Sequence, residues 1–319
     1  MPLEERQLQR LRHELEIHMG SEALCAFRDP RTIELMLNAD GRLWVEKLGG
    51  SPEPVCSLTK QSAEAICQLV SSALDKTIDK DRPIVEGEFP LDGSRFEGLL
   101  PPLVSAASFS IRKKASLIFR LEDYVKSGTM TEAQRRVIEE GIESHANILI
   151  VGGTGSGKTT LVNACIAHMV EKFPHERIVI IEDTGEIQCS AENALQLHST
   201  MTTSMTDLLK ATLRLRPDRI LVGEARGPEA LDLLMAWNTG HPGGVATVHA
   251  NSAEGGLERI RMLVSMNSFA PQDSEILIGE AVNYVIFIAR DPALGRQVKE
   301  IIRVEGYDAN SKRYRFKKL

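Results

Sequence analysis

The sequence of 319 residues has few aromatic residues, few cysteines and no long apolar run. Its five cysteines are odd in number, scattered and never arranged as C-x-x-C, so neither a disulfide framework nor a thiolate zinc site is indicated. Apolar stretches such as "NILIVGG" and "YVIFIAR" are far shorter than the roughly 20 residues that cross a bilayer. The first segment, "MPLEERQLQRLRHELEIHMG", lacks the apolar centre of a secretory signal. We therefore expect a cytoplasmic protein with no membrane span.

Two further shortages argue against direct binding of nucleic acid. The formal net charge is −6, and aromatic residues make up only 5% of the chain. A ring helicase or DNA translocase would need a basic pore or aromatic side chains on which bases stack. A local basic channel is compatible with the total charge, so the charge balance alone does not exclude DNA.

The length indicates two domains, because one domain usually takes roughly 100 to 200 residues. The first part predicts a helix over residues 4–18, a hairpin turning at Asn38–Gly41, a helix capped by Thr59 and a second hairpin turning at Asp92-Gly93. A strand in "SFSIRKKA" completes this part. We expect a small α+β domain of PAS-like type over residues 1–112 and a linker over residues 113–128.

From residue 129 onward, helical segments alternate with buried, mostly unalternating strands. The strands are predicted in "NILIVG", "RIVIIED", "RILVGE", "GVATVHA" and "YVIFIAR". This alternation is typical of an α/β fold with a largely parallel sheet and helices on both faces. We expect it to form the second domain, residues 129–319.

A phosphate-binding loop lies between the first of these strands and the helix "KTTLVNACIAHMVEKF". The pattern G-x-x-x-x-G-K-[ST] is matched by Gly152, Gly153, Thr154, Gly155, Ser156, Gly157, Lys158 and Thr159, and Thr160 continues it. The glycines let backbone N–H groups surround phosphate oxygens at the start of a helix. Lys158 would neutralise the β- and γ-phosphates, and the Thr159 hydroxyl would hold Mg²⁺. The cofactors expected are ATP and Mg²⁺.

Acidic residues follow two later strands. "RIVIIEDTGEI" supplies Glu182, Asp183 and Glu186, and "RILVGE" supplies Glu224. The carboxyl ends of parallel strands are where ligands of open α/β sheets lie, so we predict Glu224 as the base that polarises water. Glu182 and Glu224 would also help to hold Mg²⁺, partly through water. The alternatives are a solvated acidic turn and, for Glu224, a salt bridge with Arg226.

Two histidines, His241 and His249, flank a short apolar run in "NTGHPGGVATVHAN". No third or fourth ligand accompanies them at metal-site spacing. His249 follows a predicted strand of the same sheet, whereas His241 is also compatible with a packed core position. Guanidinium groups that stabilise phosphoryl transfer could come from Arg95, Arg112, Arg214 and Arg216.

The chain resembles the secretion ATPase family that powers bacterial type IV secretion, conjugation, pilus assembly and type II secretion. The resemblance rests on "SFSIRKKA", "LIVGGTGSGKTTL", "IIEDTGEI", "LRLRPDRILVGEARGPEA" and "NTGHPGGVATVHAN", in this order. In that family the last three are the aspartate box, Walker B and the histidine box. The motifs are clear over residues 110–251, and the match is closest to conjugal-transfer members.

The resemblance implies a RecA-like ATPase domain and a homohexamer. His249 would sense the terminal phosphate, with His241 supporting the loop. Arg112 and Arg95 would reach the γ-phosphate from the N-terminal domain, and Arg216 would contact a neighbouring subunit's nucleotide. The residues alone also allow each arginine to be a surface charge. The partners implied are components of an inner-membrane secretion or conjugation complex, with peripheral membrane contact.

Three alternatives to a conjugation motor stay open. One is a ring helicase or DNA translocase on the same core. A second is a pilus retraction or type II secretion motor of the same family. The third is a nucleotide-switched scaffold whose hydrolysis is incidental. The basic segment "SKRYRFKKL" could contact anionic lipid, or it could be a solvated terminal strand.

Overall fold

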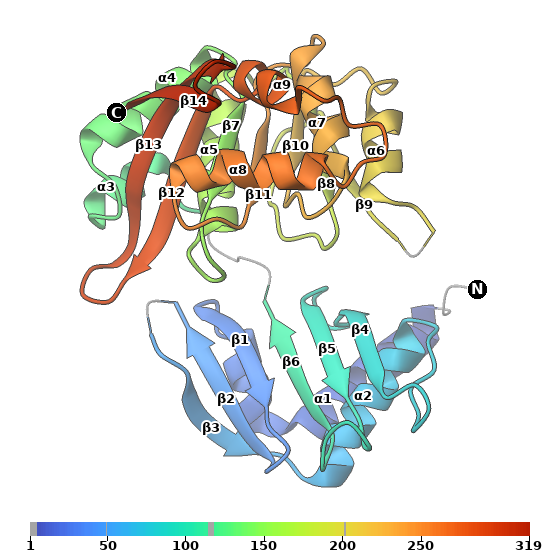
Figure 1. The fold of residues 1–319 in the computed structure, drawn as a ribbon. Helices are drawn as coiled ribbons and strands as arrows, with labels where there is room; N and C mark the ends of the chain where they lie inside the picture. The colour runs from blue at the N-terminus through green and yellow to red at the C-terminus, as the bar shows by residue number, and fades with distance from the viewer. Residues whose placement is uncertain (1–4, 49, 114–117, 201) are drawn as a thin grey trace. The chain divides into compact units, whose positions relative to one another are not determined.

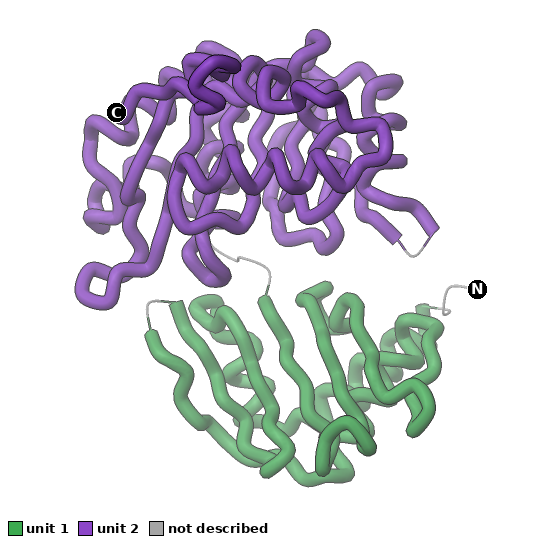
Figure 2. Tube along the Cα trace, in the orientation of Figure 1, with its two compact units in different colours: residues 1–117 green, residues 118–319 purple. Residues whose placement is uncertain are grey.

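The computed structural model describes residues 5–48, 50–113, 118–200 and 202–319, and it divides the chain into two compact units. Unit 1 covers residues 1–117 and unit 2 covers residues 118–319 (Figure 2). The boundary falls inside the predicted linker of residues 113–128. Residues 114–117 of that linker lie outside the described residues, and the rest of it after residue 117 belongs to unit 2.

Unit 1 is an antiparallel sheet with two helices packed on one face (Figure 1). Its elements are α1 (Glu5–Arg28), β1 (Thr32–Leu37), β2 (Arg42–Lys47), β3 (Glu53–Ser57), α2 (Lys60–Ala73), β4 (Ile84–Glu88), β5 (Arg95–Leu99) and β6 (Ser108–Arg112). The strand order is β3-β2-β1-β6-β5-β4. Both predicted hairpins form, and the Thr59 hydroxyl caps α2 by accepting a hydrogen bond from the Ser62 N–H.

Alternation along the strands decides which side chains of unit 1 are buried. Leu35, Phe96, Phe109 and Ile111 point into the core between the sheet and the helices. Their neighbours in sequence, such as Arg112, lie on the opposite face and are half-buried. This period of two is the pattern of a sheet with one covered face.

Unit 2 is an eight-stranded sheet with helices on both faces (Figure 1). Its helices are α3 (Leu121–Lys126), α4 (Glu132–Glu143), α5 (Lys158–Lys172), α6 (Met205–Thr212), α7 (Glu229–Asn238), α8 (Ala253–Val264) and α9 (Ser274–Ala281). Its strands are β7 (Ile148–Val151), β8 (Ile178–Glu182), β9 (Ala194–His198), β10 (Arg219–Val222), β11 (Val245–Val248), β12 (Tyr284–Asp291), β13 (Gly295–Asp308) and β14 (Arg313–Lys318).

The strand order in unit 2 is β14-β13-β12-β7-β11-β10-β8-β9. The strands β12, β7, β11, β10, β8 and β9 run parallel to one another. Strand β13 is antiparallel to β12, and β14 is antiparallel to β13. All five predicted strands are present, and the terminal segment forms β14. The edge strand β9 and the long strand β13 were not predicted.

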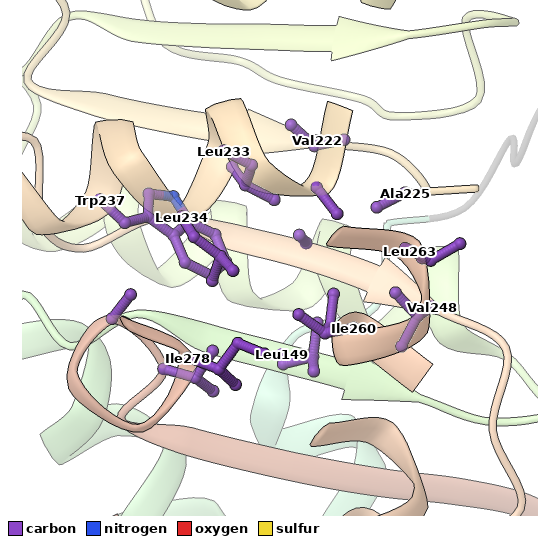
Figure 3. Close-up of a cluster of buried hydrophobic side chains, with 14 of the residues drawn as sticks. Leu149, Val222, Ala225, Leu233, Leu234, Trp237, Val248, Ile260, Leu263 and Ile278 are labelled. Carbon is purple, nitrogen blue, oxygen red and sulfur yellow. The ribbon is translucent and has the colours of Figure 1, made fainter. Parts of the chain in front are cut away.

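Two apolar clusters cover the faces of this sheet. One joins α6–α9 to sheet side chains such as Leu149 and Val222, which Figure 3 shows with their neighbours. The other joins α3–α5 to the opposite face. It includes Leu121 and Tyr124 of the predicted linker, which α3 buries in unit 2. Among the helices that the structure describes, none is both long and apolar enough to cross a bilayer.

Candidate nucleotide site

The phosphate loop joins the end of β7 to the start of α5. Gly155 and Gly157 adopt φ of +68° and +100°, which glycine tolerates without steric cost. A Cβ on Gly152 would lie 2.2 Å from the Ile288 carbonyl oxygen, so no larger residue fits there. A Cβ on Gly153 or Gly155 would meet no atom within 4 Å, so the outer part of the loop is open. The loop thus fits a phosphate chain approaching its backbone N–H groups at the start of a helix.

Lys158 and Thr159 follow this loop as the first two residues of α5. The Lys158 ammonium is buried and donates hydrogen bonds to the carbonyl oxygens of Gly152 and Gly153, both at 3.0 Å. The Thr159 hydroxyl lies 3.5 Å from Oε2 of Glu186. A hydroxyl beside a carboxylate and a phosphate site is an oxygen-rich environment of the kind that Mg²⁺ prefers.

The aspartate box leaves β8 and turns back toward α5. Glu182 is 3% exposed, and its Oε1 accepts hydrogen bonds from the backbone N–H groups of Glu186, at 3.1 Å, and Ile187, at 2.9 Å. Asp183 is exposed and accepts a hydrogen bond of 2.6 Å from the Ser199 hydroxyl. Glu182 therefore fixes the turn that presents Glu186, while Glu186 is the acid that lies beside Thr159.

Glu224 follows β10 and has a partner on each carboxylate oxygen. Its Oε1 lies 3.0 Å from Nε2 of His249, and its Oε2 accepts a hydrogen bond of 3.0 Å from Arg226. Arg226 also lies 3.4 Å from Asp183, so it links two strand ends. The backbone N–H of Arg226 donates to buried Glu229, which holds the segment after Glu224 in place.

The surroundings of this pair lower both pKa values, through neighbouring charges for Glu224 and mainly through burial for His249. Burial alone would raise the pKa of Glu224, but the hydrogen bond and charge of Arg226, with His249 and Lys158, lower it overall. Burial lowers the pKa of His249, and the charge of Lys158 lowers it further. Glu224 is therefore ionised and His249 neutral near pH 7. A neutral imidazole can donate one hydrogen bond, and its contact with the carboxylate assigns that proton to Nε2.

The two histidines lie at opposite ends of β11. His241 precedes this strand, where Gly243 and Gly244 donate their N–H groups to buried Asn147. His249 follows the strand and joins Glu224. Within the described residues, no group of three or more His, Cys, Asp or Glu side chains could hold a metal ion. Of the two histidines, His249 is the one at the end of the sheet where the phosphate loop lies.

The predicted arginines occupy two other regions. Arg95 and Arg112 are direct partners on β5 and β6 of unit 1, half-buried on the face that α1 and α2 do not cover. Arg214 and Arg216 are exposed and precede β10, at the edge of the sheet opposite the phosphate loop. Within unit 2, then, the acids, Lys158 and His249 converge, and Arg216 does not join them.

Arg226 was expected from sequence only as a salt-bridge partner that would occupy Glu224, and the salt bridge between Arg226 and Glu224 is present. Arg296 was not among the predicted site residues. Its Nε donates a hydrogen bond of 3.2 Å to the carbonyl oxygen of Gly155. The two residues are 141 positions apart, so only the pairing of β12 with β7 brings them together. No local pattern could have indicated that contact.

Comparison with known proteins agrees with this geometry. A family model described as "Type II/IV secretion system protein" matches residues 58–305. The conjugal transfer protein TrbB of Rhizobium radiobacter is 50% identical over 301 residues, which cover 94% of this chain and 92% of that protein.

Two solved structures share the fold. The ATPase DotB of Yersinia pseudotuberculosis gives a TM-score of 0.63 at 16% identity, with 95% of this chain and 81% of that chain covered. The pilus retraction motor PilT with bound ADP gives a TM-score of 0.58 at 21% identity, with 83% and 77% covered.

The fold is that of these structures, with an α+β unit before a RecA-like unit that carries the phosphate loop. The chain belongs to the type II/IV secretion system protein family. The predicted resemblance to this family, and to its conjugal-transfer members, is thereby confirmed.

Proposed function

We propose that this protein hydrolyses Mg-ATP as a cytoplasmic hexamer, and that hydrolysis powers conjugal DNA transfer or pilus assembly by a type IV secretion apparatus. One observation carries the proposal. Lys158, Thr159, Glu186, Glu224 and His249 converge at the carboxyl ends of four parallel strands. The 50% identity to a protein named for conjugal transfer supports the choice of apparatus.

The residues divide the work of phosphoryl transfer. N–H groups of the phosphate loop would hold the α- and β-phosphates, and Lys158 would neutralise charge toward the γ-phosphate. Thr159 would bind Mg²⁺, with carboxylates contributing directly or through water. Glu224 is the proposed base for the attacking water. Neutral His249, bound to Glu224, would change its contact when the terminal phosphate leaves.

A motor also needs groups that bind ATP and ADP differently. We propose that Arg112 and Arg95 of unit 1 contribute to γ-phosphate binding, and that Arg216 acts on the nucleotide of a neighbouring subunit. Within unit 2, Arg216 is exposed at the end of the sheet opposite the phosphate loop, which supports a role on the nucleotide of another subunit. The partners would be other components of the inner-membrane transfer complex, and contact with the membrane itself would be peripheral.

The first test is ATP turnover by purified wild-type protein and the Lys158→Ala variant, with mass measured by light scattering with and without an ATP analogue. We expect turnover that depends on Lys158 and a hexameric mass. Hexamers that bind ATP without turnover would instead support the nucleotide-switched scaffold. A monomer under every condition would contradict the ring motor.

A further inference from the structure

The hairpin of β12 and β13 contacts the phosphate loop, although its residues belong to none of the family motifs. Arg296, the second residue of β13, donates its Nε–H to the Gly155 carbonyl oxygen at 3.2 Å. Its aliphatic part also packs on the loop, since a Cβ on Gly157 would lie 3.0 Å from Cδ of Arg296. Arg296 thus touches two of the glycines that shape the loop.

Several hydrogen bonds fix the position of this hairpin. The Asp291 carboxylate accepts from the backbone N–H groups of Ala293 and Leu294 and pairs with Lys299 at 2.5 Å. Beyond the turn, the Val298 N–H donates to the Thr129 carbonyl at 2.8 Å. Arg296 is therefore presented to the phosphate loop by a constrained strand rather than by a free loop.

The guanidinium of Arg296 keeps most of its donors available. A guanidinium carries five N–H donors, and the bond to Gly155 uses the one on Nε. Among the residues that the structure describes, neither terminal nitrogen has a hydrogen-bond partner and no carboxylate pairs with Arg296. An uncompensated positive charge thus lies against a loop built for anions.

We propose that Arg296 is a nucleotide-binding residue whose guanidinium holds the phosphate loop through Nε and contacts the α- and β-phosphates through its terminal nitrogens. Loop residues of this motif cradle the α- and β-phosphates, whereas the lysine serves the β- and γ-phosphates. Because Arg296 contacts Gly155 and Gly157, it should favour nucleoside diphosphates and triphosphates equally. The inference rests on the proposed function, since it needs a nucleotide in this loop.

The test compares Arg296→Gln with Arg290→Gln in the full-length protein. Glutamine keeps an N–H that can reach the Gly155 carbonyl, so Arg296→Gln removes mainly the charge. Arg290 is the direct partner of Arg296 in the hairpin, is exposed, and makes no described contact with the loop, which makes it a matched control for charge. Dissociation constants for ADP and ATP would be measured by calorimetry at low and high salt.

We expect Arg296→Gln to weaken the binding of ADP and of ATP about tenfold each, as for the loss of one charge-assisted contact. The difference in dissociation constant between Arg296→Gln and wild type should become smaller at high salt, because screening weakens an exposed charge pair. Arg290→Gln should stay within about twofold of wild type. The melting temperature without nucleotide should not fall in either variant, because Arg290 and Arg296 lie directly opposite each other and like charges in such pairs repel.

Three outcomes would overturn the inference. Unchanged affinity in Arg296→Gln, with affinity lost in Lys158→Ala, would show that nucleotide binds here without Arg296. A loss of affinity for ATP alone, with the affinity for ADP kept, would place the contact at the γ-phosphate instead. A loss of affinity that does not depend on salt and comes with a lower melting temperature would show that Arg296 has only a structural role. Absence of nucleotide binding by wild type would overturn the proposed function itself, and is distinguishable from all three.

Discussion

Nε2 of His249 lies 3.0 Å from Oε1 of Glu224, across the ends of two neighbouring parallel strands. Strands β10 and β11 pair at Val222 and Ala246, so the residues that follow them emerge at the same edge of the sheet. Arg226 holds the other oxygen of Glu224. The acid proposed as base and the histidine proposed as sensor are thus one hydrogen-bonded unit, and a change at either must affect the other.

The first prediction concerns the pH dependence that His249 adds to stability. A histidine ordinarily titrates near pH 6.5, and burial and Lys158 lower the pKa of His249 in the folded protein. Between those two pKa values the unfolded chain binds the extra proton, so stability falls as pH drops below about 6.5. We expect the urea midpoint of wild type to fall more steeply from pH 7.5 to pH 5.5 than that of His249→Gln. Parallel pH profiles would contradict the lowered pKa.

The second prediction separates the roles of Glu224 and Glu186. Glu224→Gln should keep ATP affinity within about threefold and lower turnover by about 10² to 10⁴, the range for loss of general base catalysis. Glu186→Gln should lower turnover less and raise the Mg²⁺ requirement, because Glu186 lies beside Thr159. Single-turnover kinetics at varied Mg²⁺ would measure both. If Glu186→Gln were the more damaging change at saturating Mg²⁺, the base would be Glu186. Glu254→Gln, at an exposed position of α8, is the control.

Much of this site could be predicted because strand ends are readable from sequence. Unbroken apolar runs predict buried parallel strands, and the polar residues after them must meet at one edge of the sheet. Sequence does not reveal the direction of an individual side chain after such a strand. Glu182, for example, folds back onto its own turn although it lies in the expected segment. Long-range contacts such as that of Arg296 depend on strand order, which motifs do not encode.

The third prediction tests whether Glu182 holds the turn or the metal. Glu182→Gln keeps an acceptor oxygen for the N–H groups of Glu186 and Ile187. We expect its Mg²⁺ half-saturation to match wild type, whereas that of Thr159→Ala should rise. Glu182→Ala leaves two N–H groups without their acceptor and should cost about 1–3 kcal/mol of stability. A raised Mg²⁺ requirement in Glu182→Gln would support the metal-ligand role predicted from sequence.

The fourth prediction concerns the buried guanidinium of Arg219, which no solvent reaches. It pairs with Glu176 at 2.5 Å and donates to the Gly243 carbonyl at 3.1 Å, at the sheet edge opposite the phosphate loop. Arg219→Met should cost about 3–5 kcal/mol of unfolding free energy, because it removes the buried cation that pairs with Glu176 and leaves that carboxylate, among the described residues, only its contact with His145. Exposed Arg214→Met should change stability by less than about 0.5 kcal/mol. Urea unfolding followed by Trp237 fluorescence would measure both, and a loss below 1 kcal/mol would refute the prediction.

The fifth prediction uses the direct pairing of Arg95 and Arg112 on β5 and β6. Like charges directly opposite each other on two strands repel, and the outer partners Glu34, opposite Arg112 on β1, and Glu88, opposite Arg95 on β4, offset this repulsion. Arg112→Ala should therefore leave the melting temperature unchanged or slightly raised. Turnover should nevertheless fall at least 10²-fold with nucleotide affinity nearly kept, as for an arginine that acts on the transition state.

The matched control for Arg112→Ala is Arg42→Ala, at an exposed position of the same sheet. Steady-state kinetics, nucleotide titration and thermal melting of the two variants would be compared with wild type. Equal losses of affinity and turnover in Arg112→Ala would make Arg112 a ground-state contact, since an interaction present in both states lowers the two together. Unchanged turnover would make the arginine pair a surface feature of unit 1. Only a loss of turnover without a loss of stability identifies a pair whose repulsion is retained for function.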